Sequence, residues 1–114
     1  EPLFNLASYL ASFDFLLMPS RHEGLSILAL EANFNGLPAI INACPGLHET
    51  LPNDWPLRVE HNDLNTYLHL FNDVLPVINR HEIQTIARQF AEKHFSMCSM
   101  REGYERLYAQ AFKA

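Results

Sequence analysis

The chain has 114 residues, the length of one small domain, and its balance of 48% hydrophobic to 18% charged residues indicates a globular protein rather than a disordered one. The formal net charge of −5, without a basic stripe, argues against nucleic acid and against direct contact with an anionic membrane. No apolar run approaches the ~20 residues of a membrane span, and no signal-peptide pattern is present.

The two cysteines, Cys44 and Cys98, lie far apart in the sequence and form no Cys-x-x-Cys pair. We expect free thiols in a reducing compartment, and therefore a cytoplasmic protein. The histidines have no His-x-His or His-x3-His spacing and no Asp-x-Asp occurs, so we expect no metal site.

In the first half of the chain, short apolar runs alternate with segments of helical periodicity. Continuous apolar runs of four or five residues are typical of strands that are buried on both faces. A glycine after a helical segment marks its C-cap. The predicted elements are the end of a helix at 6–13, a buried strand at 15–18, a helix at 24–33 capped by Gly36, a second buried strand at 38–42 and a helical turn at 47–51.

The second half is predicted to be mostly helical. Its elements are a short strand at 57–60, a helix that starts at Asn62 or Asp63 and ends or kinks at Pro76, a helix at 80–94, and a last helix capped by Ser96.

Alternation of strands and helices predicts an α/β fold with a Rossmann-like parallel sheet flanked by helices. Three strands are fewer than the mean of about 5–6, and no strand precedes the first helix. We therefore expect that the first strands of the domain are missing from this chain. The strand at 15–18 would then be an unprotected edge, through which the fragment could form a homodimer.

Ligands of parallel sheets bind beyond the carboxyl ends of the strands, which here means the loops at 19–24 and 43–48. The first loop leads into the predicted helix, whose initial amides would be unpaired donors that suit an anion, most often phosphate. These are the amides of Gly24, Leu25, Ser26 and Ile27.

Two carboxylates flank these amides. Glu23 lies at the start of the predicted helix, and Glu31 lies two helical turns further on, ~12 Å at 1.5 Å per residue. Two acceptors at this separation suit a long ligand with hydroxyls at both ends, such as a nucleotide sugar. On physical grounds alone a structural role is the more common one: Glu23 as a helix-start acid, and Glu31 as an exposed or salt-bridged side chain.

The same stretch resembles the E-x7-E signature of the GT-B glycosyltransferases of family four, the "group 1" glycosyltransferases. The signature residues are Ser20-Arg21-His22-Glu23-Gly24, Glu31-Ala32 and Gly36-Leu37-Pro38. Other positions match the family in the right order over almost the whole chain, although Pro45 stands where the first glycine of a G-G-x-x-E loop is usual. They are Asp14, Pro19-Ser20, Pro38-Ala39-Ile40-Ile41, Gly46-Leu47-His48-Glu49, Phe95-Ser96 and Leu107-Tyr108.

This resemblance implies roles for particular residues. Glu23 would be the catalytic residue, lying beside the donor sugar and contacting its hydroxyls, and Glu31 would bind the ribose hydroxyls. The amides of Gly24, Leu25, Ser26 and Ile27 would approach the diphosphate or the sugar. Gly46 and Glu49 would line the same rim, where Pro45 removes one amide donor.

The resemblance also implies a function for the protein as a whole. Residues 1–114 would be the C-terminal part of the nucleotide-sugar-binding domain of a retaining glycosyltransferase, of the hexosyltransferase type. The enzyme would transfer sugar from a nucleotide-diphosphate sugar to a glycan or lipid-linked acceptor in polysaccharide biosynthesis, without a metal or other cofactor. The acceptor domain and the basic pair that neutralises the diphosphate would precede Glu1, so we expect the fragment alone to be inactive.

The full-length protein would be cytoplasmic or peripheral at the inner face of the membrane. Two alternatives stay open. One is a non-catalytic nucleotide-sugar-binding module with the same fold. The other is an unrelated α/β interaction domain, which predicts an exposed Glu31 and no pocket at the strand ends. Nucleotide-sugar epimerases share the architecture but differ in their motif.

Overall fold

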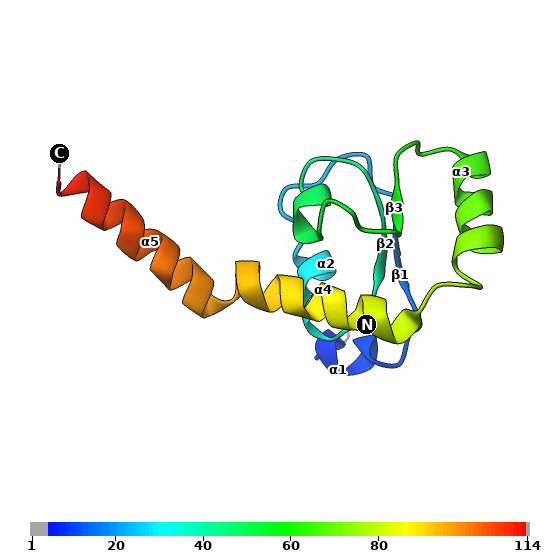
Figure 1. Cartoon of the computed structure of the whole chain (residues 1–114), viewed down its shortest axis with the longest axis horizontal. Helices are drawn as coiled ribbons and strands as arrows, with labels where there is room; N and C mark the ends of the chain where they lie inside the picture. Colours follow the sequence, from blue (N-terminus) through cyan, green and yellow to red (C-terminus); the bar gives the residue numbers. More distant parts are fainter. Residues whose placement is uncertain (1–4, 114) are drawn as a thin grey trace.

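A three-stranded parallel sheet forms the centre of the computed structural model, which describes residues 5–113 (Figure 1). The strands are β1 (Leu16–Met18), β2 (Ala39–Asn42) and β3 (Arg58–Val59), in the order β1-β2-β3. In the register of the sheet, Leu17 is paired with Ile40 and Ile41 with Arg58. The predicted α/β class with a Rossmann-like parallel sheet is confirmed, although each strand is one or two residues shorter than expected.

Helices cover both faces of the sheet. Helix α2 (Ile27–Phe34) and helix α4 (Arg80–Phe95) pack against each other, and α3 (Leu64–His69) lies on the opposite side of the sheet from α2 (Figure 1). The remaining elements are α1 (Leu6–Leu10), the 3-10 turn η1 (His48–Thr50), the π-helical segment η2 (Leu70–Val74) and α5 (Met97–Ala111).

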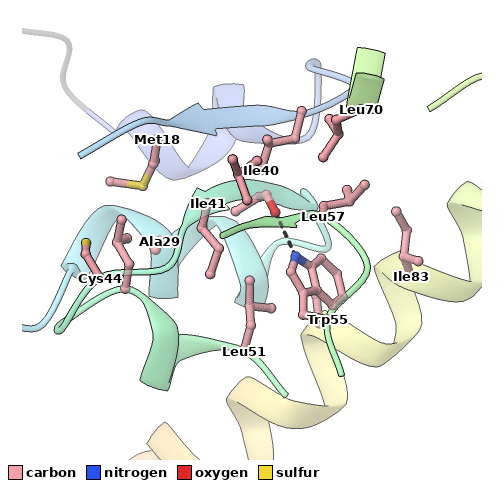
Figure 2. Packing of buried hydrophobic residues seen from close by; sticks show 14 residues of the cluster. Met18, Ala29, Ile40, Ile41, Cys44, Leu51, Trp55, Leu57, Leu70 and Ile83 are labelled. Carbon is pink, nitrogen blue, oxygen red and sulfur yellow. Dashed lines mark hydrogen bonds between the residues drawn. The ribbon is translucent and has the colours of Figure 1, made fainter. Parts of the chain in front are cut away.

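The core lies around β2, whose four residues are all buried. Leu57 and Val59 bury their side chains beside it, and Ile83 of α4 and Leu70 of η2 pack on the same cluster (Figure 2). The indole Nε1 of Trp55 donates a hydrogen bond to the carbonyl oxygen of Ala39 at 2.9 Å, so this large side chain is satisfied inside the core (Figure 2).

Strand β1 is not buried on both faces, and this prediction was wrong. Leu17 is 48% exposed, because β1 pairs only with β2 among residues 5–113 and no described element covers the outward side of Leu17. The strand therefore has one open edge and one partly open face, as expected of an edge strand.

Helix α2 begins at Ile27 and not at Gly24. Ser26 is the N-cap, with an extended backbone and a side-chain oxygen that accepts from the Ala29 amide at 3.3 Å. The other end was predicted correctly: Gly36 has a φ of 70°. Its amide donates to the carbonyl of Asn33 and that of Leu37 to the carbonyl of Ala32, which is a Schellman motif.

In the second half, Asp63 is the cap of α3, because its Oδ1 accepts from the Thr66 amide at 2.9 Å. The helix then widens into η2, where the Leu75 amide reaches the Leu70 carbonyl, and it ends before Pro76. Ser96 caps α5 as predicted, because its Oγ accepts from the amide of Ser99.

Helix α5 projects away from the sheet and has no buried residue, which gives the molecule extents of 54 × 32 × 30 Å (Figure 1). Its apolar side chains are exposed. They are Met97, Met100, Tyr104, Leu107, Tyr108 and Phe112. Within residues 5–113, no helix has both the length and the apolar character to span a membrane.

Candidate functional site

The two loops that were expected to form the site meet at the carboxyl edge of the sheet. The amide of Ser26 donates to the carbonyl oxygen of Gly46 at 3.1 Å. Gly46 has a φ of 85°, and a Cβ on it would lie 1.6 Å from the carbonyl oxygen of Gly24. Only glycine fits this approach, so the loop after β1 and the loop after β2 form one packed unit.

Within the loop after β2, Glu49 folds back on its own backbone. Its Oε2 accepts from the amide of Gly46 at 2.7 Å. Hydrogen bonds from its own amide and from that of Gly46 hold the pKa of the Glu49 carboxyl below its ordinary value of 4.5. Glu49 thus stays ionised and shapes the loop, while its side chain remains exposed at the rim.

Glu23, in the loop after β1, is half-buried, and its Oε1 accepts from the hydroxyl of Ser20 at 2.7 Å. The backbone beneath it is also tied down. Asn42 donates to the carbonyl of Ser20 and Asn62 to that of Pro19, each at 3.1 Å. The backbone at Pro19 and Ser20 is therefore held by contacts from β2 and from the segment before α3.

The thiol of Cys44, in the loop after β2, is buried. Burial raises its pKa above the ordinary value of 9.0, and the carboxylates of Glu23 and Glu49 raise it further. Both acids therefore lie close to the thiol. From the sequence we predicted only that Cys44 is a free thiol, which the structure shows, because no local spacing reveals which loops pack around it.

Glu31 occupies a different setting. It lies on α2, is exposed, and its carboxylate has no hydrogen-bond partner among residues 5–113. Its neighbours on the helix, Leu30, Ala32 and Asn33, are buried, whereas Glu31 lies on the exposed side of α2. The expected rise of two helical turns from Glu23 does not apply, because the backbone from Gly24 to Ser26 is not helical.

Of the four amides expected to face an anion, that of Ser26 is already bonded to Gly46. The hydrogen bonds of residues 5–113 include none from the amides of Gly24, Leu25 or Ile27. The side chains of Leu25 and Ile27 are 50% and 62% exposed. The start of α2 thus presents open donors between two apolar side chains.

A hollow of about 180 Å³ lies at this edge, lined by residues 43–45, His48 and Glu49. The alternative of an unrelated interaction domain predicted an exposed Glu31 and no pocket at the strand ends. Glu31 is indeed exposed, but a hollow is present at the strand ends. His22 and Arg21 are exposed in the neighbouring loop. A larger hollow of about 360 Å³ lies elsewhere, between α1, the Gly36 turn and Arg88 of α4.

Among residues 5–113, the chain has a parallel α/β sheet with carboxylates and unbonded amides at its carboxyl edge. This is the arrangement of a Rossmann-like domain, a class in which ligands bind at that edge of the sheet. The model of the family described as "Family 4 Glycosyltransferase in conflict systems" matches residues 4–105. The chain belongs to this family, and the expected relation to the family 4 glycosyltransferases is confirmed.

A curated relative supports the same assignment. The chain is 30% identical, over 104 residues and 90% of its own length, to an "Uncharacterized 41.2 kDa protein in cps region" of Klebsiella pneumoniae. The matched region is 29% of that relative, so the chain spans less than a third of it. No solved structure matches the chain.

Proposed function

We propose that this chain forms the donor-binding part of a retaining GT-B glycosyltransferase and that residues 20–38 are its E-x7-E signature. The full-length protein would transfer a hexose from a nucleotide-diphosphate sugar to a glycan or lipid-linked acceptor. One observation carries the proposal: open amides at the start of α2 lie beside Glu23, and the Glu49 loop packs against them. Family membership supplies the reaction class.

In this proposal each part of the edge has a separate role. The amides of Gly24, Leu25 and Ile27 bind the diphosphate or the sugar, and Ser26 acts as the cap that orients them. Glu23 contacts the hydroxyls of the donor sugar. Glu31 accepts from the ribose hydroxyls, and an exposed carboxylate is free to do so without a desolvation cost in the unbound protein.

The chemistry would depend mainly on electrostatics. As the bond between sugar and diphosphate breaks, negative charge develops on the leaving diphosphate, and fixed amide donors aimed at it stabilise the transition state. Glu23 would hold the sugar while the ring carbon gains oxocarbenium character. No metal is assigned a role in this proposal.

The remaining partners belong to the whole protein. We propose that a preceding acceptor domain and a basic pair complete the active site, and that the fragment alone does not transfer sugar. The full-length protein would act in the cytoplasm or at the inner face of the membrane. The location of the relative's gene, named as the cps region, supports a role in polysaccharide biosynthesis.

A non-catalytic nucleotide-sugar module is the second candidate, and two observations favour it. Pro45 offers no amide at the rim, and the amide of Ser26 is already used by Gly46. Fewer donors remain for a diphosphate than the sequence pattern suggested. Sugar transfer by the full-length parent protein, measured with each nucleotide sugar, separates catalysis from binding alone.

The donor site itself can be tested on the 114-residue chain. UDP-glucose, GDP-mannose and ADP-glucose are titrated while amide chemical shifts are followed. We expect shifts centred on residues 24–28, lost in Glu31→Ala and kept in Glu92→Ala, a matched exposed acid that lines the larger hollow. Shifts centred on α4, or equal responses in both variants, would contradict the proposed site.

A further inference from the structure

Three side-chain hydrogen bonds involve the Pro19-Ser20 segment that follows β1. The amide group of Asn42 donates to the carbonyl of Ser20, and that of Asn62 donates to the carbonyl of Pro19. The hydroxyl of Ser20 then donates to Glu23. These contacts connect the end of β2 and the segment before α3 to one carboxylate.

Asn42 is the buried member of this set. It is 6% exposed, and its Oδ1 is buried without a hydrogen-bond partner in the part of the chain that the structure describes. Leaving a buried acceptor unpaired costs about as much free energy as the one hydrogen bond of its Nδ2 contributes. The side chain therefore adds little net stability, and its main effect is on the position of the Ser20 carbonyl.

We propose that Asn42, supported by the exposed Asn62, is a positioning residue for Glu23. By fixing the Ser20 carbonyl it fixes the Ser20 backbone, so that the Ser20 hydroxyl points at the Glu23 carboxylate and holds it in one orientation. The identity of the ligand that Glu23 then meets rests on the proposed function. The positioning of Glu23 does not.

Asn33 provides a matched control. It is fully buried, its Nδ2 donates to the carbonyl of Thr50 at 2.9 Å, and its Oδ1 is likewise without a partner among residues 5–113. It thus makes the same kind of contact as Asn42, but the carbonyl it holds belongs to η1 and not to the loop after β1, which carries Glu23.

The first experiment needs no ligand. Three-bond NMR couplings report the side-chain rotamer of Glu23 in the folded chain. We expect one dominant rotamer in the wild type and in Asn33→Ala, and averaged couplings in Asn42→Ala and Ser20→Ala. Because Ser20 is only half-buried, Ser20→Ala tests its hydrogen bond to Glu23 even if Asn42→Ala fails to fold. An unchanged Glu23 rotamer in Ser20→Ala, or in folded Asn42→Ala, would overturn the proposal.

The second experiment compares each nucleotide sugar with its nucleotide diphosphate: UDP-glucose with UDP, GDP-mannose with GDP, and ADP-glucose with ADP. Asn42→Ala is expected to weaken binding of the sugar-bearing ligand roughly tenfold and to leave the diphosphate unchanged, with no further loss in a Glu23→Gln background. An equal loss for both ligands would indicate a merely structural role and overturn the proposal.

The two experiments distinguish a failure of the positioning role from a failure of the proposed donor site. Suppose that neither this chain nor the full-length protein binds any of these ligands, while Glu23 has one rotamer in the wild type and several in Asn42→Ala. The positioning role then stands, and the proposed donor site is contradicted. If the ligands bind at residues 24–28 but Asn42→Ala changes neither the rotamer nor the affinity ratio, the donor site stands and the positioning role is contradicted.

Discussion

Gly46 approaches Gly24 so closely that a Cβ on Gly46 would lie 1.6 Å from the Gly24 carbonyl oxygen. The obstacle is backbone and not the flexible end of a side chain, so no rotamer change relieves it. The same residue has a φ of 85° and a carbonyl that accepts from the Ser26 amide. This one glycine therefore decides how the two loops pack and keeps the Ser26 amide occupied.

The first prediction concerns this contact. Gly46→Ala should lower the free energy of unfolding by about 1–3 kcal/mol from the positive φ and the clash together, measured by denaturant unfolding. Gly103→Ala is the control, because nothing lies within 4 Å of its added Cβ and it lies inside α5. There alanine should be neutral or stabilising by about 0.5–1 kcal/mol. Equal effects of the two substitutions would show that the loops do not pack in this way.

The second prediction concerns pH. The pKa of Glu49 is lowered from 4.5 by its own amide and that of Gly46, so the ionised form is favoured in the folded state. The hydrogen bond from the Gly46 amide to the Glu49 carboxylate is therefore complete above pH 4.5, and it is lost as the pH falls through the lower pKa of the folded state. The amide proton shift of Gly46 should follow this titration, with a midpoint below 4.5. In Glu49→Gln the same proton should show no such step.

The third prediction compares two leucines. Leu57 is fully buried beside β2, whereas Leu107 is 62% exposed on α5. Leu57→Ala should cost about 2–5 kcal/mol of unfolding free energy, because it leaves a cavity in the core. Leu107→Ala should change it by no more than about 0.5 kcal/mol. A large loss at Leu107 would mean that α5 packs on the domain instead of projecting from it.

The order and type of the elements follow from local signals. Period-3.6 patterns mark α2 and α4, short apolar runs mark β1 and β2, and a glycine past a helical run marks the left-handed cap at Gly36. These features depend on residues that are neighbours in sequence, so a single chain suffices to predict them. The carboxyl-edge loops follow as well, because parallel strands end at the same edge.

The features that were missed depend on contacts between distant residues. The loop before α2 is held by a hydrogen bond from the Ser26 amide to the carbonyl of Gly46, twenty positions further on. The exposure of Leu17 depends on what covers an edge strand, which the pattern of β1 does not contain. The placement of Cys44 close to Glu23 and Glu49 likewise arises only when the two loops meet. The local sequence thus predicts where the site lies, and long-range contacts decide its geometry.

The last prediction concerns the open edge of β1, through which we propose that the isolated chain forms a homodimer. Its backbone groups on the side away from β2 have no strand partner among residues 5–113, and the side chain of Leu17, on the partly open face, is 48% exposed. Light scattering over a concentration series should show self-association that Leu17→Lys reduces, because a charge on an edge strand opposes pairing. Leu64→Lys, at a 72% exposed position on α3, controls for added charge, and Leu107→Lys tests whether α5 mediates the contact instead. A wild-type monomer at the highest concentration, or loss of association in Leu107→Lys alone, would exclude the β1 edge as the interface.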